Sequence, residues 1–336
     1  MAGPAPDIDR ARDALAQGSW AEAYERLRSL DPSELSAPDL EGLADAAWWV
    51  SKRDESVAAR QKAYAAYAAE SEDPRAAFMA ARLCVEHFQR REPAVAGGWL
   101  MRAQRHLREQ PEGPEHGLLA MVESTVARFT GELERATALA REATQIGQRC
   151  GHRDVIAVAI HAEGLALIAS GRVSEGIALL DEAMTSVLAG ELSPFFTGVV
   201  YCDVIEACLQ VADVRRAGEW SEAARAWCET IPPESPFPGL CRVNRAELAI
   251  LRGDWAEAEA EATRASEELS RVDPADSGSA WYVAGEARRR SGNAAGAEEA
   301  FARAQDLGFE PQPGWALLRL GQGKIEAARN ALRAAI

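Results

Sequence analysis

A short phrase recurs along this sequence. Residues 18–27 read GSWAEAYERL, and residues 253–265 read GDWAEAEAEATRA. In both, a turn precedes a helix-forming stretch, and over most of the chain the same pattern returns at intervals of about 40 residues, a period typical of stacked helical repeats. The turn residues that mark the pattern are Gly18, Ser51, Arg91, Gly131, Gly171, Ala212, Gly253, Gly292 and Gly323.

A small residue stands five positions after each of these markers. These residues are Ala23, Ser56, Ala96, Ala136, Gly176, Ala217, Ala258, Ala297 and Ala328. A glycine at the marker can adopt positive φ and end one helix, and a small residue lets the next helix pack closely against it. Apolar residues in stretches such as AAFMAARLCVEHF recur at helical spacing, without the alternation of a strand. Each repeat is therefore predicted to be a helical hairpin.

A single hairpin cannot bury both of its apolar faces, whereas stacked hairpins can. We therefore predict an all-α fold, a solenoid of about nine helical hairpins in a right-handed superhelix, with the first helices on a concave inner surface. Segments rich in Pro and Gly, such as IPPESPFPG and FEPQPG, fall between hairpins. Residues 1–336 are thus expected to form a single helical-repeat domain.

Two resemblances follow from these phrases. GSWAEA, GDWAEA and GNAAGA, together with Trp281 and Gly285, resemble tetratricopeptide repeats, although the period exceeds the usual length of about 34 residues. Longer phrases, including GIALLDEAMTSVLAGELSP and FEPQPGWALLRLGQGKIEAARNALR, resemble the repeat region of actinobacterial LuxR-type transcriptional regulators. In that family a helical array precedes a C-terminal helix-turn-helix, which nothing here resembles. The second resemblance covers essentially the whole chain and implies a regulatory or sensor array.

The charge balance argues against direct nucleic-acid binding. Of 336 residues, 52 are acidic and 37 are basic, which gives a formal net charge of −15. Such a surface repels phosphates, whose binding depends on Lys and Arg. The first 16 residues lack the apolar block of a signal peptide, and no apolar run is long enough for a membrane span. A cytoplasmic protein that does not bind membranes is therefore expected.

No sequence motif points to catalysis. A phosphate-binding loop, GxGxxG, HExxH and GxSxG are all missing, and the five histidines are dispersed. Cys84 and His87 share a helix but lack a third orienting group. The six cysteines have no metal-like spacing and are expected to be reduced core residues. We therefore expect no enzyme activity, no catalytic residue, no cofactor and no metal; an enzyme that uses His161 beside Glu206 is the least favoured alternative.

Function in such an array is expected on the inner surface, where side chains of successive first helices converge. The repeat register selects positions three, six and ten residues before each marker. Adjacent Trp48 and Trp49 point about 100° apart on a helix, and Trp48 is the better ligand candidate. The predicted ligand or partner contacts are Trp48, Phe88, Met121, His161, Ile168, Glu206, Leu209, Glu247, Tyr282, Glu286 and Arg289. This mixture suits a peptide segment or a small effector, unless these residues only pack a tightly wound array.

Two functions fit these observations. The first is a non-enzymatic sensor module of a LuxR-type regulator that binds an effector or partner on its concave face. The second is a stand-alone scaffold that binds a peptide or helical segment of another protein. Leu320, Ile325, Leu332 and Ile336 form an apolar face without a capping helix, so we expect a piece of a longer chain; the alternatives are a naturally short relative or a homodimer that covers this end.

Overall fold

The computed structural model describes the backbone of residues 4–272 and 274–334 and the side chains of residues 7–272 and 274–333. Within these ranges the chain forms eighteen α-helices and two short 3-10 helices, and no strand. The all-α prediction is confirmed. The α-helices are α1 (Pro4–Ala16), α2 (Trp20–Arg28), α3 (Ala37–Trp49), α4 (Arg53–Ala69), α5 (Asp73–Gln89), α6 (Pro93–Leu107), α7 (Pro114–Phe129), α8 (Leu133–Cys150), α9 (Arg153–Ala169), α10 (Val173–Leu188), α11 (Pro194–Gln210), α12 (Val214–Cys228), α13 (Pro236–Arg252), α14 (Trp255–Val272), α15 (Ser277–Arg290), α16 (Ala294–Asp306), α17 (Gly314–Gly321) and α18 (Ile325–Ala334); the 3-10 helices are η1 (Pro32–Glu34) and η2 (Pro274–Asp276).

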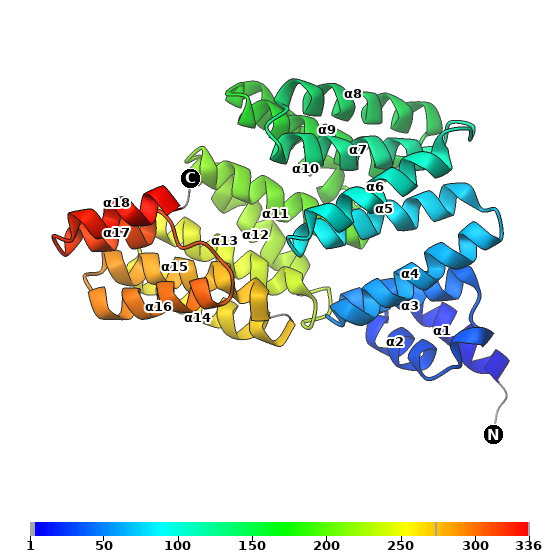
Figure 1. Ribbon diagram of the computed structural model, residues 1–336, viewed down its shortest axis with the longest axis horizontal. Helices are drawn as coiled ribbons and strands as arrows, with labels where there is room; N and C mark the ends of the chain where they lie inside the picture. Colours follow the sequence, from blue (N-terminus) through cyan, green and yellow to red (C-terminus); the bar gives the residue numbers. More distant parts are fainter. Residues whose placement is uncertain (1–3, 273, 335–336) are drawn as a thin grey trace. The chain divides into compact units, whose positions relative to one another are not determined.

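The helices fall into two compact units. Unit 1 comprises Met1–Val200 and unit 2 comprises Tyr201–Ile336, so the boundary lies within α11. In unit 1 the packed pairs are α1 with α2, α3 with α4, α5 with α6, α7 with α8 and α9 with α10. In unit 2, α13 packs on α14, α15 on α16 and α17 on α18, yellow to red in Figure 1. Each unit is therefore built from helical hairpins, whereas the single domain and the handedness remain predictions.

The turn inside each hairpin is the one that the markers predict. All nine marker residues have positive φ, from 57° at Ala212 to 89° at Gly292. At the α9/α10 turn, Gly171 N–H donates to the Ile168 carbonyl and Arg172 N–H donates to the Leu167 carbonyl, both at 2.9 Å. These two bonds satisfy carbonyls at the end of a helix, in the manner of a Schellman motif. The marker prediction is confirmed even at the three positions without glycine.

The small residues after the markers lie where two helices approach each other. All nine are buried. In the α9/α10 hairpin a Cβ placed on Gly176 would lie 2.5 Å from the carbonyl oxygen of Gly164. A Cβ placed on Gly164 would in turn lie 3.0 Å from the carbonyl oxygen of Gly176. The backbones of α9 and α10 therefore approach closely at these two glycines.

Because Gly176 lies at this close approach and Gly97 does not, substitution by alanine is expected to have opposite effects on stability at the two sites. Gly176→Ala is expected to lower the free energy of unfolding by about 1–3 kcal/mol, because its Cβ collides with backbone that must move. Gly97 is an exposed residue of α6, and a Cβ placed on it would have no atom within 4 Å. Gly97→Ala is therefore expected to raise the free energy of unfolding by about 1 kcal/mol, because alanine has the higher helix propensity. Urea unfolding followed by circular dichroism measures both. Equal signs would contradict the packing described for α9 and α10.

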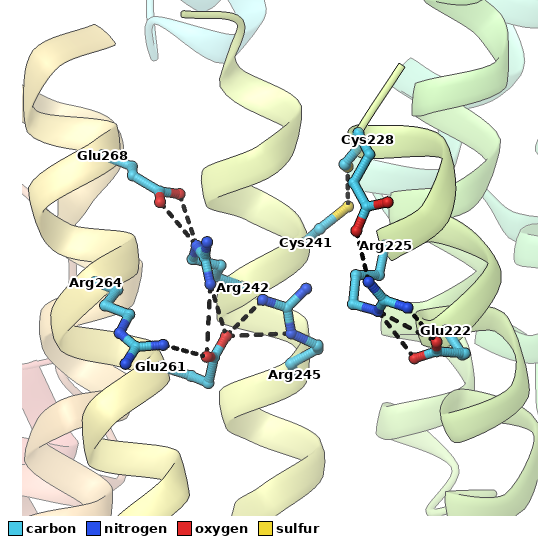
Figure 2. A network of polar contacts seen from close by, with 10 residues as sticks. Glu222, Arg225, Cys228, Cys241, Arg242, Arg245, Glu261, Arg264 and Glu268 are labelled. Carbon is cyan, nitrogen blue, oxygen red and sulfur yellow. Dashed lines mark hydrogen bonds and ion pairs between the residues drawn. The ribbon is translucent and has the colours of Figure 1, made fainter. Parts of the chain in front are cut away.

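Ion pairs also join the helices of a hairpin in unit 2. Figure 2 shows Arg242 of α13 between two glutamates of α14, at 2.8 Å from Glu268 and 3.3 Å from Glu261. Arg245, one turn further along α13, contacts Glu261 at 2.6 Å. Both arginines are only partly exposed, so these contacts are better shielded from water than a fully exposed pair. Two glutamates of α14 are thus paired with arginines of α13.

All six cysteines are free thiols. Cys228 and Cys241 face each other with their sulfur atoms 3.3 Å apart, as Figure 2 shows. The expectation of core positions is wrong for Cys150, which is exposed because it is the last residue of α8.

The predicted apolar face near the end of the sequence is partly described. Leu320, Ile325 and Leu332 are exposed, and Ile336 lies outside the described residues. Among the described helices, none combines the length and apolar character that crossing a bilayer requires.

Candidate ligand-binding site

Unit 1 contains a cavity of about 240 Å³ between its first helices. We call it the unit 1 cavity. Its walls come from the C-terminal part of α3, from α5, and from the first residues of α7, α9 and α11. The lining residues are Trp20, Asp45, Trp48, Trp49, Arg75, Phe78, Arg82, Pro114, Glu115, Leu118, His152, Asp154, Ser193, Pro194, Phe195 and Phe196.

Aromatic rings make up much of the wall. The ring of Trp48 meets that of Phe195 edge to face, with centroids 5.0 Å apart. Trp49 turns away, is buried, and stacks on Trp20 at 5.3 Å. Both tryptophans line the cavity, but the divergence of two neighbouring helix positions leaves Trp48 half-buried and Trp49 buried. Such walls favour an apolar, planar ligand group, since aromatic pairs gain energy beyond their buried area.

A half-buried guanidinium borders the same cavity. Only 14% of the Arg82 side chain is exposed, and its guanidinium lies 4.0 Å from the centre of the Phe195 ring. Arg82 makes no hydrogen bond to a described residue, and its nearest carboxylate is that of Asp45, at 3.9 Å. Burial, with the positive charge of Arg60 nearby, lowers the pKa of Arg82 to about 10. The group therefore stays charged at neutral pH while its hydrogen-bond donors are unused.

Asp45 is already engaged by a second arginine. Two N–H groups of fully buried Arg60 donate to one oxygen of Asp45, both at 3.1 Å, and a third donates to Glu86 at 2.8 Å. Arg75, at another edge of the cavity, pairs with Glu41. Of the two arginines that line the cavity, Arg82 is therefore the one whose N–H donors are available to a ligand.

Three helices begin at the cavity. The N-terminal residues of α7, α9 and α11 line it, and the N-terminus of a helix carries a partial positive charge. Asp154 of α9 accepts a hydrogen bond from the Ser193 N–H just before α11, at 2.8 Å. His152 caps α9 by accepting from the Val155 N–H. The acidic residues here therefore offset the partial positive charge of the helix starts.

Of the five predicted contacts in unit 1, Trp48 lines the cavity and the other four do not. Phe88 packs against Phe129, with ring centroids 5.2 Å apart, and Met121 packs on buried alanines. His161 is buried within α9. Ile168 fills the space over Gly176, because its Cγ1 lies 2.7 Å from where a Cβ would stand. The side chain of Ile168 therefore packs within the α9/α10 hairpin, where the two helices approach closely.

The predicted contacts in unit 2 form two groups. Burial, with the negative charge of Glu206, raises the pKa of half-buried Glu247 to about 7, so α11 and α13 present neighbouring carboxylates. On α15, buried Glu286 accepts two hydrogen bonds from Arg289, each at 2.8 Å. Burial, with the charge of Glu286, also raises the pKa of Tyr282 to about 12. Leu209 is buried.

The two residues of the enzyme alternative lie in different compact units. His161 belongs to unit 1 and Glu206 to unit 2. Within the part of the chain that the structure describes, no group of three or more His, Cys, Asp or Glu side chains is arranged to hold a metal ion.

The sequence reasoning missed Arg82, Phe195 and Phe196. One signal for Arg82 was present, because a lone arginine within the apolar run AAFMAARLCVEHF must find a partner when the helix is buried. For the two phenylalanines there was none, since their contacts with α3 and α5 depend on how five hairpins stack.

Comparison with known proteins shows the class of fold. No protein-family model matches the sequence, and no curated protein sequence is significantly similar. Among solved structures, the chain is similar to a Rap protein complexed with competence and sporulation factor (10% identity, TM-score 0.67, covering 92% of this chain and 87% of the other). It is also similar to a human IFIT1 dimer with PPP-AAAA (14%, 0.54, 92% and 73%) and to a tetratricopeptide repeat protein from Parabacteroides merdae (13%, 0.48, 80% and 98%). The fold is therefore that of a tetratricopeptide-like helical-repeat protein.

Proposed function

We propose that this chain is a non-enzymatic interaction module whose unit 1 cavity binds part of a protein or peptide partner, or a small effector. The observation that carries this proposal is the partly enclosed aromatic cavity beside Arg82, since ligand sites are concave and apolar with a few placed polar groups. The similar Rap structure contains competence and sporulation factor, and the similar IFIT1 structure contains PPP-AAAA. Ligand binding by helical-repeat folds of this kind supports the proposal.

Within that proposal, we further propose a sensor role in a LuxR-type transcriptional regulator. Its support is the resemblance of whole phrases, such as GIALLDEAMTSVLAGELSP, to the repeat region of that family. A ligand could then act on a DNA-binding domain only by binding one arrangement of the array more tightly than another.

A stand-alone scaffold is the second candidate, and one observation in unit 2 favours it. Glu206 and Glu247 are close enough for their charges to interact, which is unfavourable for two carboxylates. A lysine or arginine of a bound peptide segment would relieve that repulsion.

A thermal-shift screen of metabolites and short peptides tests the proposed function. A ligand that binds the folded array must raise its melting temperature. We expect hits whose shift disappears in Trp48→Leu and persists in Trp99→Leu. The two residues are matched, since Trp99 is also half-buried and meets Tyr64 edge to face at 5.1 Å, but away from the cavity. A screen without hits, or hits that survive Trp48→Leu, would contradict the proposal.

A further inference from the structure

We propose that the unit 1 cavity recognises a carboxylate attached to an aromatic ring, with Arg82 binding the carboxylate and the ring lying against Trp48 and Phe195. This deepens the proposed function, on which it rests, by naming the chemical group that is bound. That group occurs both at the C-terminus of a peptide ending in an aromatic residue and in a free aromatic acid.

The unused donors of Arg82 are the first reason. A guanidinium has five N–H groups in a fixed fork that matches a carboxylate with two parallel hydrogen bonds. In this side chain, which is only 14% exposed, none of these donors bonds to a described residue. Its guanidinium is also held over the Phe195 ring, at 4.0 Å, which restricts its orientation. A carboxylate entering the cavity would meet donors that are already positioned.

The carboxylates that line the cavity are partly compensated by other groups. The nearest carboxylate, Asp45, already accepts two hydrogen bonds from Arg60. Asp154 accepts the Ser193 N–H, and both Asp154 and Glu115 stand in the first turn of a helix, whose positive end offsets their charge. Among the two arginines that line the cavity, Arg75 pairs with Glu41, whereas Arg82 makes no hydrogen bond to a described residue.

The size of the cavity fits one ring and one small polar group. A cavity of about 150 Å³ in another protein is large enough to hold benzene. The 240 Å³ here leaves space for a two- or three-atom chain and a carboxylate. Larger fused systems or two consecutive side chains would exceed it. These dimensions match 3-phenylpropionate or a single C-terminal phenylalanine.

Titration of the full chain with matched acids and amides tests the proposal. The probes are 3-phenylpropionate and 3-phenylpropionamide, and the peptide Gly-Gly-Gly-Phe with a free or an amidated C-terminus. Binding is followed by tryptophan fluorescence, since Trp48 borders the cavity. We expect at least one acid to bind about tenfold or more tightly than its amide, because a hydrogen bond to a charged group is lost in the amide. The pair that shows the preference identifies the free acid or the peptide terminus as the source.

Arginine variants locate the preference. Arg82→Met is expected to abolish the difference between acid and amide, and Arg82→Lys to keep part of it. Arg128→Met is the matched control, because Arg128 also lies over a phenylalanine, 4.3 Å from the Phe129 ring, but does not line the cavity. We expect this control to bind as the unmodified chain does.

Two results would overturn the inference. One is equal binding of acid and amide in both pairs, or no saturable binding of any probe. This comparison uses the unmodified chain, so it does not depend on whether a variant folds. The other is an acid preference that survives Arg82→Met. In either case, a thermal-shift hit that depends on Trp48 would still support the proposed function. Failure of this inference can therefore be distinguished from failure of the proposed function.

Discussion

Arg60→Met is expected to lower the free energy of unfolding by about 3–5 kcal/mol, the cost of removing one partner from a buried ion pair. Arg60 is 0% exposed and donates to Asp45 and Glu86, of which Glu86 is itself buried. Without the guanidinium, the buried Glu86 carboxylate loses the ion pair that it makes with Arg60. Urea unfolding followed by circular dichroism, with hydrogen exchange of α4 and α5, measures the effect.

Two further variants separate charge from packing. In the double variant Arg60→Met with Glu86→Gln, much of the lost stability should return, because no unpaired charge remains on Glu86. Arg225→Met is the surface control, since Arg225 also contacts two glutamates, as Figure 2 shows, but is 45% exposed. Little change is expected there. A loss in Arg60→Met no larger than in Arg225→Met would show that the ion pair is not buried as described.

Glu247→Gln is expected to stabilise the chain above neutral pH, by up to about 3 kcal/mol, and to have much less effect near pH 4. Burial, with the charge of Glu206, raises the pKa of Glu247 from 4.5 to about 7. The folded chain therefore holds this proton more tightly than the unfolded chain does. Stability is thus lost as the pH rises from about 4.5 through 7, and the loss is complete above about pH 8. Unfolding free energies of both proteins between pH 4 and 9 measure the difference.

Unit 2 contains no histidine whose titration could overlap with that of Glu247. All five histidines of the chain, His87, His106, His116, His152 and His161, lie in unit 1, so no imidazole of unit 2 titrates near pH 7. Glu206→Gln should reduce the pH dependence by removing the neighbouring charge while keeping the burial of Glu247. A difference between Glu247→Gln and the unmodified chain that does not change with pH would contradict the buried position of this carboxyl group.

The features that could be predicted from the sequence are local ones. Each hairpin turn depends on a residue with positive φ and on a small residue five positions later, which is why even Ala212 could be placed without a glycine. The pairing of Glu206 with Glu247 was also accessible, since both occupy the same position in successive repeats.

The unit 1 cavity was beyond such reasoning. Phe195 reaches Trp48 and Arg82 across many repeats, so its place depends on small rotations between hairpins that add up along the chain. Ile168 shows the other limit. Its position in the repeat register pointed to the inner surface, but the gap above Gly176 takes up its side chain. Which way an apolar residue turns depends on how closely two helices cross, and the sequence does not contain that distance.

Amide hydrogen exchange with and without the strongest thermal-shift ligand tests most directly whether function lies in the unit 1 cavity. We expect added protection at the C-terminal end of α3, in the N-terminal part of α5 and at the first turns of α7, α9 and α11, where the lining residues lie. Protection confined to the second helices α4, α6, α8 and α10, or to unit 2, would contradict it.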